Sequence, residues 1–341
     1  MRIGVLTSGG DCPGLNAVIR SVVHRGLDVH GDEILGIEDG FRGLIEGRAR
    51  PVGHDDVTGL LTLGGTILGS ARVHRDKIHW AVEHATELAG RLGLDALIAI
   101  GGEGTLTAAK LFSDAGLPVV GVPKTIDNDI DATDVTFGFD TAVHVATEAI
   151  DRLKTTAESH QRVMVVELMG RHTGWITLTA GMAGGAHGIL IPEKPFDIEA
   201  VARMIEERFA RGKTFAIIAV AEGATPVPGT FPFDHGAVDQ FGHRTFGGIG
   251  TRLARELEDL LGKEARPVIL GHTQRGGTPT ARDRVLATRF GWHAVEAVHK
   301  GAFGHFTALR GNEIQLVPVA EAVTHLKTVP PDRWAESEAV L

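Results

Sequence analysis

The chain has 341 residues, which is long for one hydrophobic core and suggests two α/β lobes. Its composition, 43% hydrophobic and 23% charged, is that of a soluble globular protein. Its net charge of −9 argues against nucleic acid as the main partner, because a phosphate backbone requires a basic surface. No apolar run approaches the ~20 residues of a membrane span and no signal-peptide pattern opens the chain, so we expect a cytoplasmic protein without a membrane partner. The single cysteine, Cys12, excludes an intramolecular disulfide.

Short apolar runs alternate with helical patterns along most of the chain, which is typical of βαβ units in mainly parallel sheets with helices on both faces. The predicted strands are residues 3–7, 33–37, 96–100, 118–122, 162–168, 188–191, 214–220 and 266–270. The predicted helices are residues 14–29, 77–92, 104–115, 139–157, 174–184, 197–211, 247–262 and 280–300. Residues 223–246 interrupt this alternation, and their Pro, Gly and His content predicts a surface loop.

The first motif, TSGGDCPGLNAVIR at residues 7–20, predicts a strand, a glycine turn and then a helix. Free N–H groups and the helix dipole favour an anion at such a helix start. The motif has neither GxGxxG nor GxxxxGK[ST], so it is not an ordinary nucleotide fingerprint. A plain strand-to-helix turn is the alternative.

The second motif, GGEGT at residues 101–105, follows a predicted buried strand. Its glycines expose the backbone to a phosphate chain, and Glu103 can hold Mg²⁺ directly or through water. The alternative is an acid that only complements a helix dipole. The position at a strand end favours phosphate.

The third motif is TIDND at residues 125–129. Thr125, Asp127 and Asp129 alternate, so in an extended segment their side chains share one side. Paired carboxylates repel each other, which raises one pKa toward the range of a general base. An Asx turn is the alternative for such a string. The preceding Lys124 can hold a phosphate or neutralise the acidic cluster.

Several arginines lie beside glycines in predicted loops, where their planar guanidinium groups can bind phosphate in a bidentate manner. They belong to the segments SARVHR (70–75), HQR (160–162), MGRHTG (169–174) and GHTQRGG (271–277). Glu222 follows a strand, where α/β enzymes place ligand contacts. The 17 histidines show no paired metal spacing, so no zinc site is predicted.

The ordered set TSGGDCPGLN, GSAR, GGEGT, PKTIDNDI, SHQR, MGR, AEG and GHTQRGG resembles the 6-phosphofructokinases over about residues 1–310. This resemblance implies an α/β fold of two interwoven three-layer α/β/α lobes with mainly parallel sheets. The nucleotide-phosphate lobe would comprise residues 1–138 and about 252–305. The sugar-phosphate lobe would comprise residues 139–251 and about 306–341.

The resemblance implies transfer of a phosphoryl group from ATP, with Mg²⁺, to the 1-hydroxyl of fructose 6-phosphate. Asp127 would be the base, supported by Thr125 and Asp129, while Arg72 and Arg171 would stabilise the charge on the transferred group. Glu103 would be the magnesium-linked acid. The residues that would contact the nucleotide are Gly10, Arg72, Val73, Gly102, Glu103, Gly104 and Thr105.

The resemblance also implies a set of sugar-phosphate contacts: Thr125, Ile126, Asp127, Arg162, Met169, Gly170, Arg171, Glu222, Arg266, His272, Thr273, Gln274 and Arg275. Arg162 and Arg266 match arginines that family members lend across a subunit interface. Fructose 6-phosphate and ATP would therefore bind to a homo-oligomer with shared sites, a dimer or a tetramer, with the tetramer favoured.

The phosphoryl donor depends on two positions. In this family a glycine after the acid of the GG-acid motif accompanies ATP, and Gly104 leaves room for the α-phosphate. Lys124, however, is the residue found in pyrophosphate users, so a pyrophosphate-dependent fructose 6-phosphate 1-phosphotransferase is the alternative. We favour ATP, because a steric block is harder to evade than an extra positive charge.

Two other classes of function share part of this pattern. Lipid and NAD kinases share a GGDGT-like loop but do not need the GHTQRGG, MGR and SHQR segments together. A non-catalytic sugar-phosphate sensor could use the same fold, because a fold alone does not prove activity. The presence of all the expected charged site residues disfavours the sensor.

Overall fold

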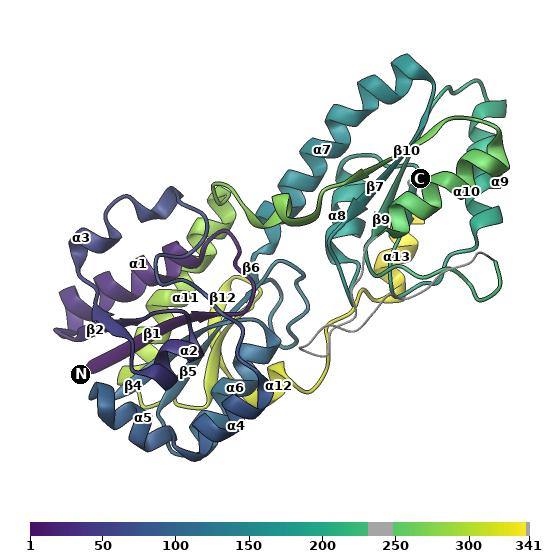
Figure 1. Cartoon of the computed structure of the whole chain (residues 1–341). Helices are drawn as coiled ribbons and strands as arrows, with labels where there is room; N and C mark the ends of the chain where they lie inside the picture. Colours follow the sequence, from purple (N-terminus) through teal and green to yellow (C-terminus); the bar gives the residue numbers. More distant parts are fainter. Residues whose placement is uncertain (231–247, 339–341) are drawn as a thin grey trace. The chain divides into compact units, whose positions relative to one another are not determined.

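The computed structural model describes residues 1–230 and 248–338. The chain divides into two compact units: unit 1 comprises residues 1–141 and 275–326, and unit 2 comprises residues 142–274 and 327–341 (Figure 1). Each unit is built around its own sheet. Within the described residues, no helix has the length and apolar character that crossing a bilayer requires.

Unit 1 has a mostly parallel sheet with the strand order β12-β11-β5-β4-β1-β2-β3, and β6 pairs with β5. The edge strands β3 and β12 are antiparallel to their neighbours. β4 and most of β5 are buried on both faces, which explains their continuous apolar runs. The strands are β1 (Arg2–Ser8), β2 (Glu33–Ile37), β3 (Ala49–Pro51), β4 (Ala96–Gly101), β5 (Val119–Thr125), β6 (Phe137–Gly138), β11 (His305–Arg310) and β12 (Glu313–Pro318).

Helices cover both faces of this sheet (Figure 1). α1 and α11 pack against each other, and α11 also contacts β5 and β11. A separate apolar cluster joins the other face to α2, α4, α5 and α6, with the rings of Phe41 and Phe112 stacked 5.3 Å apart. The helices are α1 (Leu15–Arg25), α2 (Phe41–Glu46), α3 (His54–Val57), α4 (Arg75–Glu83), α5 (Ala85–Leu92), α6 (Glu103–Asp114), α11 (Ala281–His299) and α12 (Val319–Ala322).

Unit 2 has a parallel sheet with the order β10-β7-β9-β8. α9 and α10 share an apolar cluster with one face of β7 and β9. α8 contacts β8 and β9. The strands are β7 (Val163–Leu168), β8 (Gly188–Leu190), β9 (Ala216–Ala221) and β10 (Ala265–Ile269), and the helices are α7 (Phe139–His160, which begins in unit 1), α8 (Trp175–Ala183), α9 (Ile198–Ala210), α10 (Ile249–Leu261) and α13 (Pro331–Glu338).

The predicted α/β class with mainly parallel sheets is confirmed, while several details differ. The segment 77–92 forms two helices, α4 and α5, separated at His84. Residues 252–274 lie in unit 2 because β10 pairs with β7, and residues 306–326 lie in unit 1 because β11 pairs with β5. Of the predicted loop 223–246, residues from 231 onward lie outside the described residues.

Asp283 links α11 to the start of α7 within unit 1. Its side chain is fully buried. One carboxylate oxygen accepts hydrogen bonds from the backbone N–H of Thr141 at 2.8 Å and from the Thr141 hydroxyl at 2.6 Å. Burial raises the pKa of Asp283 to about 6, because the charged form is poorly solvated there.

The raised pKa predicts a pH-dependent loss of stability. The folded state binds the proton of Asp283 more tightly than the unfolded state, so the free energy of unfolding falls as pH rises from about 4 to about 6 and stays lower above that range. Asp283→Asn removes the charge and keeps an acceptor for Thr141. We compare the free energy of unfolding of the variant with that of the wild type at each pH. We expect this difference, variant minus wild type, to be about 1 kcal/mol more positive at about pH 7.5 than at about pH 5. Urea unfolding of both proteins at both pH values measures this difference, and an equal effect at the two pH values would contradict it.

Candidate active site

Three neighbouring strands of unit 1 end at the same edge of the sheet. β4 lies between β1 and β5, and all three are parallel. Ser8 pairs with Gly101, and Gly101 pairs with Pro123, so the three strand ends are in register. The segments that follow are the three predicted motifs. The sheet therefore brings the first glycine turn, the GGEGT loop and the TIDND segment together.

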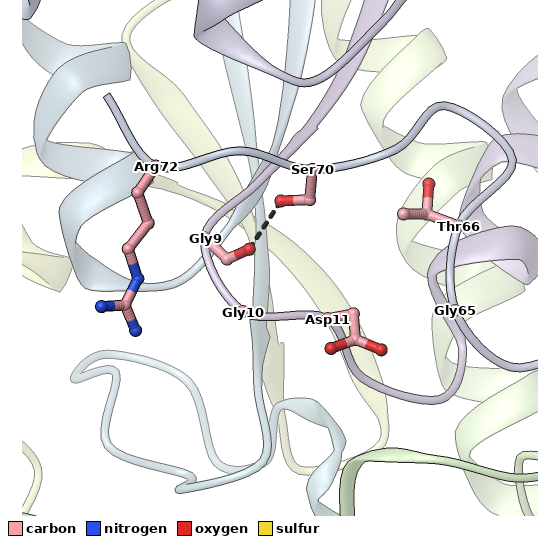
Figure 2. A pocket seen from close by; sticks show the side chains of 7 residues that line it. All are labelled: Gly9, Gly10, Asp11, Gly65, Thr66, Ser70 and Arg72. Carbon is pink, nitrogen blue, oxygen red and sulfur yellow. Dashed lines mark hydrogen bonds between the residues drawn. The ribbon is translucent and has the colours of Figure 1, made fainter. Parts of the chain in front are cut away.

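A cavity of about 410 Å³ lies at the first of these strand ends (Figure 2). Ser70 anchors one wall, since its hydroxyl donates a hydrogen bond to the carbonyl oxygen of Gly9 at 2.5 Å. Thr7 similarly donates to the carbonyl oxygen of Gly69 at 2.7 Å. Bare backbone and an exposed guanidinium make this cavity suitable for an anion. Its lining residues are Gly9, Gly10, Asp11, Gly65, Thr66, Ser70 and Arg72.

The GGEGT loop leads directly into α6. Gly102 is the N-cap residue and Glu103 is the first helical residue. Glu103 is exposed, and its carboxylate accepts a hydrogen bond from the Thr107 hydroxyl at 3.2 Å. A Cβ atom added at Gly104 would meet no atom within 4 Å. The helix start therefore presents free N–H groups and open space.

Gly101 and Thr105 show why this loop needs glycine. A Cβ atom at Gly101 would lie 2.2 Å from the hydroxyl oxygen of Thr105, whose side chain is buried. The absence of a side chain at Gly101 therefore lets α6 begin immediately after β4. Val73, also predicted to contact the nucleotide, packs partly against the apolar cluster on this face of the sheet.

The TIDND segment is a turn rather than an extended strand. Asn128 has φ = +53°, a left-handed conformation that asparagine tolerates, and its side-chain oxygen accepts the Thr136 N–H at 3.1 Å. This bond spans eight residues, so it is not the Asx turn that was the alternative, which joins a side chain to the backbone two residues on. The Asp127 N–H donates to the Thr125 hydroxyl at 3.1 Å, and the side chain of Ile126 is fully buried.

The two aspartates nevertheless interact. Burial, followed by the negative charge of Asp127 and a smaller effect from Glu103, raises the pKa of Asp129 to about 6. The Oδ1 atom of Asp129 is buried and accepts no hydrogen bond from the described residues. Carboxylates that repel one another, one with an orphaned oxygen, form a set that suits a hard divalent cation such as Mg²⁺.

Lys124 lies beneath the first glycine turn. Only 4% of the residue is exposed, and its ammonium group donates a hydrogen bond to the carbonyl oxygen of Gly10. Burial lowers the pKa of Lys124. The cation is therefore held against the backbone of the cavity wall, near the position expected for a phosphate chain.

Arg275 reaches the same turn from the start of the second segment of unit 1. Its Nη1 atom donates to the carbonyl oxygen of Asp11 at 3.1 Å, and a Cβ atom at Gly10 would lie 2.8 Å from this nitrogen. A residue predicted to contact the sugar phosphate thus contacts the turn predicted to bind the nucleotide.

In unit 2, the strand ends bring together another group of predicted residues. Met169, Gly170 and Arg171 follow β7, and Glu222 follows the neighbouring strand β9. The Glu222 N–H donates to the carbonyl oxygen of Leu168 at 2.8 Å, which joins the two loops.

The third loop of this edge follows β10 and contains a short 3-10 helix (Gly271–Arg275). Gln274 is fully buried; its side-chain oxygen accepts the Met169 N–H at 3.4 Å, and its side-chain nitrogen donates to the carbonyl oxygen of Gly271 at 3.1 Å. Gln274 therefore supports the loop from within, whereas His272 and Thr273 are exposed.

Arg162 and Arg266 lie at the opposite end of the same sheet. Arg162 immediately precedes β7, and Arg266 is the second residue of β10. Both guanidinium groups form ion pairs with Glu264. The six residues of β7 separate Arg162 from the Met169 loop, which corresponds to about 20 Å at ~3.3 Å per residue. In one chain, these arginines and Arg171 cannot contact the same phosphate.

Comparisons with known proteins show the family of the chain. The sequence profile of a family described as Phosphofructokinase matches residues 2–298. The chain belongs to the phosphofructokinase family. It is 68% identical, over the whole of both chains, to an ATP-dependent 6-phosphofructokinase 2 of Streptomyces coelicolor. It is also 61% identical, over 99% of both chains, to a pyrophosphate--fructose 6-phosphate 1-phosphotransferase of Amycolatopsis methanolica.

Solved phosphofructokinase structures share the fold. The chain matches a Pichia pastoris phosphofructokinase in the T-state with a TM-score of 0.82 and 33% identity; 99% of this chain is covered but only 36% of the yeast chain. The predicted resemblance to the family and the predicted fold class are therefore confirmed.

Some residues that line the cavity were not predicted to belong to a site. Asp11, Gly65, Thr66 and Ser70 line the cavity. Asp11 and Ser70 lie within predicted motifs, so the neighbouring motif residues could have indicated them. Gly65 and Thr66 belong to no predicted motif. Thr66 is held beside β1 by a hydrogen bond between its hydroxyl and that of Thr7 at 3.0 Å, a contact that the sequence does not reveal.

The contact between Gly223 and Arg171 gives a test of the unit 2 loops. A Cβ atom at Gly223 would lie 1.9 Å from the carbonyl oxygen of Arg171, so Gly223→Ala must displace the loop. We expect this substitution to lower the free energy of unfolding by roughly 1–3 kcal/mol. Urea unfolding measures the loss. Gly90→Ala is the matched control, because an added Cβ there meets no atom within 4 Å and alanine favours a helix; an equal effect of the two substitutions would contradict the steric argument.

Proposed function

We propose that this phosphofructokinase transfers the γ-phosphoryl group of ATP to the 1-hydroxyl of fructose 6-phosphate, giving fructose 1,6-bisphosphate and ADP in cytoplasmic glycolysis. The observation that carries the proposal is the edge of the unit 1 sheet, where a carboxylate pair follows β5 and a glycine-rich helix start follows the neighbouring strand β4. This arrangement supplies both a base and a phosphate site. The name of the Streptomyces relative supports the same reaction.

Asp127 is proposed to accept the proton of the sugar hydroxyl while that oxygen attacks the γ-phosphorus. The bond between this phosphorus and the β–γ bridging oxygen breaks, and ADP leaves. Thr125 orients the base by accepting the Asp127 N–H, and Asp129 supports it from a position close enough for the charge of Asp127 to raise the pKa of Asp129. A positioned base of this kind contributes ~10²–10⁴-fold to the rate.

The ATP phosphates would bind along the cavity and the helix start, against Gly10, Gly102, Gly104 and Thr105, with Arg72 stabilising the transferred group. Bound Mg²⁺ would neutralise phosphate charge, and Glu103 and Asp129 are the residues that would hold it. The buried, orphaned oxygen of Asp129 supports this assignment.

The sugar phosphate would be bound by the strand-end loops of unit 2, through Met169, Gly170, Arg171 and Glu222, and by His272, Thr273 and Arg275. Arg171 would also stabilise the charge that develops on the phosphoryl group. Gln274, which is buried and supports the Met169 loop, would hold these contacts in place rather than bind the sugar directly.

A pyrophosphate-dependent enzyme is the second candidate. Two observations favour it: the name of the Amycolatopsis relative and the presence of Lys124 beside the cavity proposed for phosphate. We favour ATP because the space beside Gly104 is open and can accept the further phosphate and nucleoside of ATP. The charge of Lys124 is compatible with either donor, because its hydrogen bond to Gly10 serves to hold the turn.

Asp127→Asn tests the reaction itself. We expect kcat with ATP and fructose 6-phosphate to fall ~10²–10⁴-fold with little change in sugar-phosphate affinity, because an amide cannot accept the proton. A coupled assay and isothermal titration measure the two quantities. Asp114→Asn, an exposed change in α6, should leave both unchanged. A variant at position 127 that retains near-normal turnover would refute the assigned base, and titration without turnover in the wild type would favour a sensor.

Gly104→Asp tests the donor. The new carboxylate would project into open space beside the phosphate chain, and juxtaposed like charges cost several kcal/mol, so kcat/KM for ATP should fall about 100-fold or more. An acid in the first helical turn is compatible with folding of α6. Gly90→Asp is the control, since a side chain there also meets open space. Assays with ATP and with pyrophosphate decide the outcome: wild-type turnover with pyrophosphate alone would establish the second candidate.

We also propose a homo-oligomer, with the tetramer favoured, in which Arg162 and Arg266 bind the 6-phosphate in a neighbouring subunit's site. The length of β7 supports this, because it separates these arginines from the sugar loops of their own chain.

Mixing two inactive variants tests the shared site. In random hybrids of Arg162→Ala and Asp127→Asn chains, about one quarter of the sites would combine two intact halves and regain activity. The measurement is turnover after joint unfolding and refolding, with each variant refolded alone as the control. Activity no higher than the mean of the two parents would contradict sharing.

A further inference from the structure

A cluster of metal-ligating side chains lies in unit 1 and has no part in the proposed reaction. His24, Asp28 and His54 each offer one ligand atom, and these three atoms lie within 4.8 Å of one another. His24 Nδ1 is 3.2 Å from one carboxylate oxygen of Asp28, and His54 Nε2 is 2.9 Å from the other. The imidazole rings of His24 and His54 have centroids 5.0 Å apart and are tilted by 44°.

The local backbone explains why these residues meet. His24 is in the last turn of α1, which continues into a π-helical turn (Gly26–His30) that contains Asp28. A spacing of four residues places His24 and Asp28 on the same side. His54 begins α3, and α3 packs against α1. Ligands from two segments therefore converge on one carboxylate.

We propose that His24, Asp28 and His54 form a binding site for a divalent transition-metal ion, with Zn²⁺ as the best-suited ion. Two imidazoles and one carboxylate form a ligand set that favours zinc over magnesium or calcium, and three protein ligands leave room for water. Ligands about 2.1 Å from a tetrahedral ion are about 3.4 Å apart. The three ligand atoms here lie within 4.8 Å of one another, so small rotations would bring them onto one ion.

The side chains can adjust to an ion. Their exposed fractions are 39% for His24, 50% for Asp28 and 50% for His54, so small rotations meet little steric resistance. The same exposure gives an ion direct access from solvent. Without metal, the arrangement is a polar network in which Asp28 hydrogen-bonds His24 and lies within ion-pair distance of His54, and the experiment must distinguish this network from a metal site.

The test is zinc binding by the full-length protein. The protein is first stripped with a chelator and then dialysed against micromolar Zn²⁺. Excess Mg²⁺ is present to occupy the carboxylates of the candidate active site, Glu103, Asp127 and Asp129. We expect about one bound zinc per chain by elemental analysis and a zinc-dependent rise in Tm. His54→Gln and His24→Gln should each weaken zinc binding at least ~10-fold. Loss of a residue that only hydrogen-bonds a metal ligand already weakens metal affinity by about that much, and loss of the ligand itself costs no less. Their Tm without zinc should stay close to that of the wild type.

His325→Gln is the matched control, because His325 is exposed and lies outside the cluster; it should bind zinc as the wild type does. Failure of the wild type to bind zinc would overturn the inference and leave only the metal-free polar network. Zinc binding that survives in both histidine variants but is lost in Glu103→Gln would also overturn it, because the ion would then belong to the carboxylates of the candidate active site. Turnover with ATP and fructose 6-phosphate is assayed separately, so the proposed function can fail without affecting this result.

Discussion

The parallel pairing of β1, β4 and β5 is the constraint on which the candidate active site of unit 1 depends. Backbone hydrogen bonds set these strands in register, so their carboxyl ends lie at one edge whatever side chains follow. Because each strand end opens into a different motif, the cavity, the helix start and the carboxylate pair become neighbours, and Lys124 at the end of β5 contacts the first glycine turn through Gly10. Loss of register in the sheet would separate them all.

Glycine has the same structural task in both units. Gly101 lacks a side chain, so the buried Thr105 can start α6 against it, and Gly223 leaves space for the carbonyl oxygen of Arg171. At Gly101 the missing Cβ atom leaves room for a side chain of the same loop, and at Gly223 for the backbone of another loop. These two glycines are therefore required by packing, whereas the space beside Gly104 is open.

Apolar runs and motifs were sufficient to predict β1, β2, β4, β5 and the strands of unit 2, the fold class and the grouping of GGEGT with TIDND. They did not predict β3, β6, β11 or β12, which are short or partly exposed and therefore lack a long continuous apolar run. They also missed the turn at Asn128, because its left-handed backbone is stabilised by Thr136, eight residues away. The cluster of His24, Asp28 and His54 could not be predicted for a similar reason. His54 is far from His24 in sequence, and only the packing of α3 on α1 brings it to Asp28.

Glu264 forms ion pairs with Arg162 and Arg266, so these arginines can bind a phosphate only if the ion pairs are weak enough to be replaced. Arg162, Glu264 and Arg266 have side chains that are 30%, 33% and 51% exposed. Ion pairs at this level of exposure contribute little, typically ~0–1 kcal/mol each. A phosphate group carries more charge than one carboxylate and accepts bidentate hydrogen bonds from both guanidiniums. Glu264 can therefore hold the two arginines together in the free chain and still yield them to a phosphate, so their present pairing is compatible with the shared site.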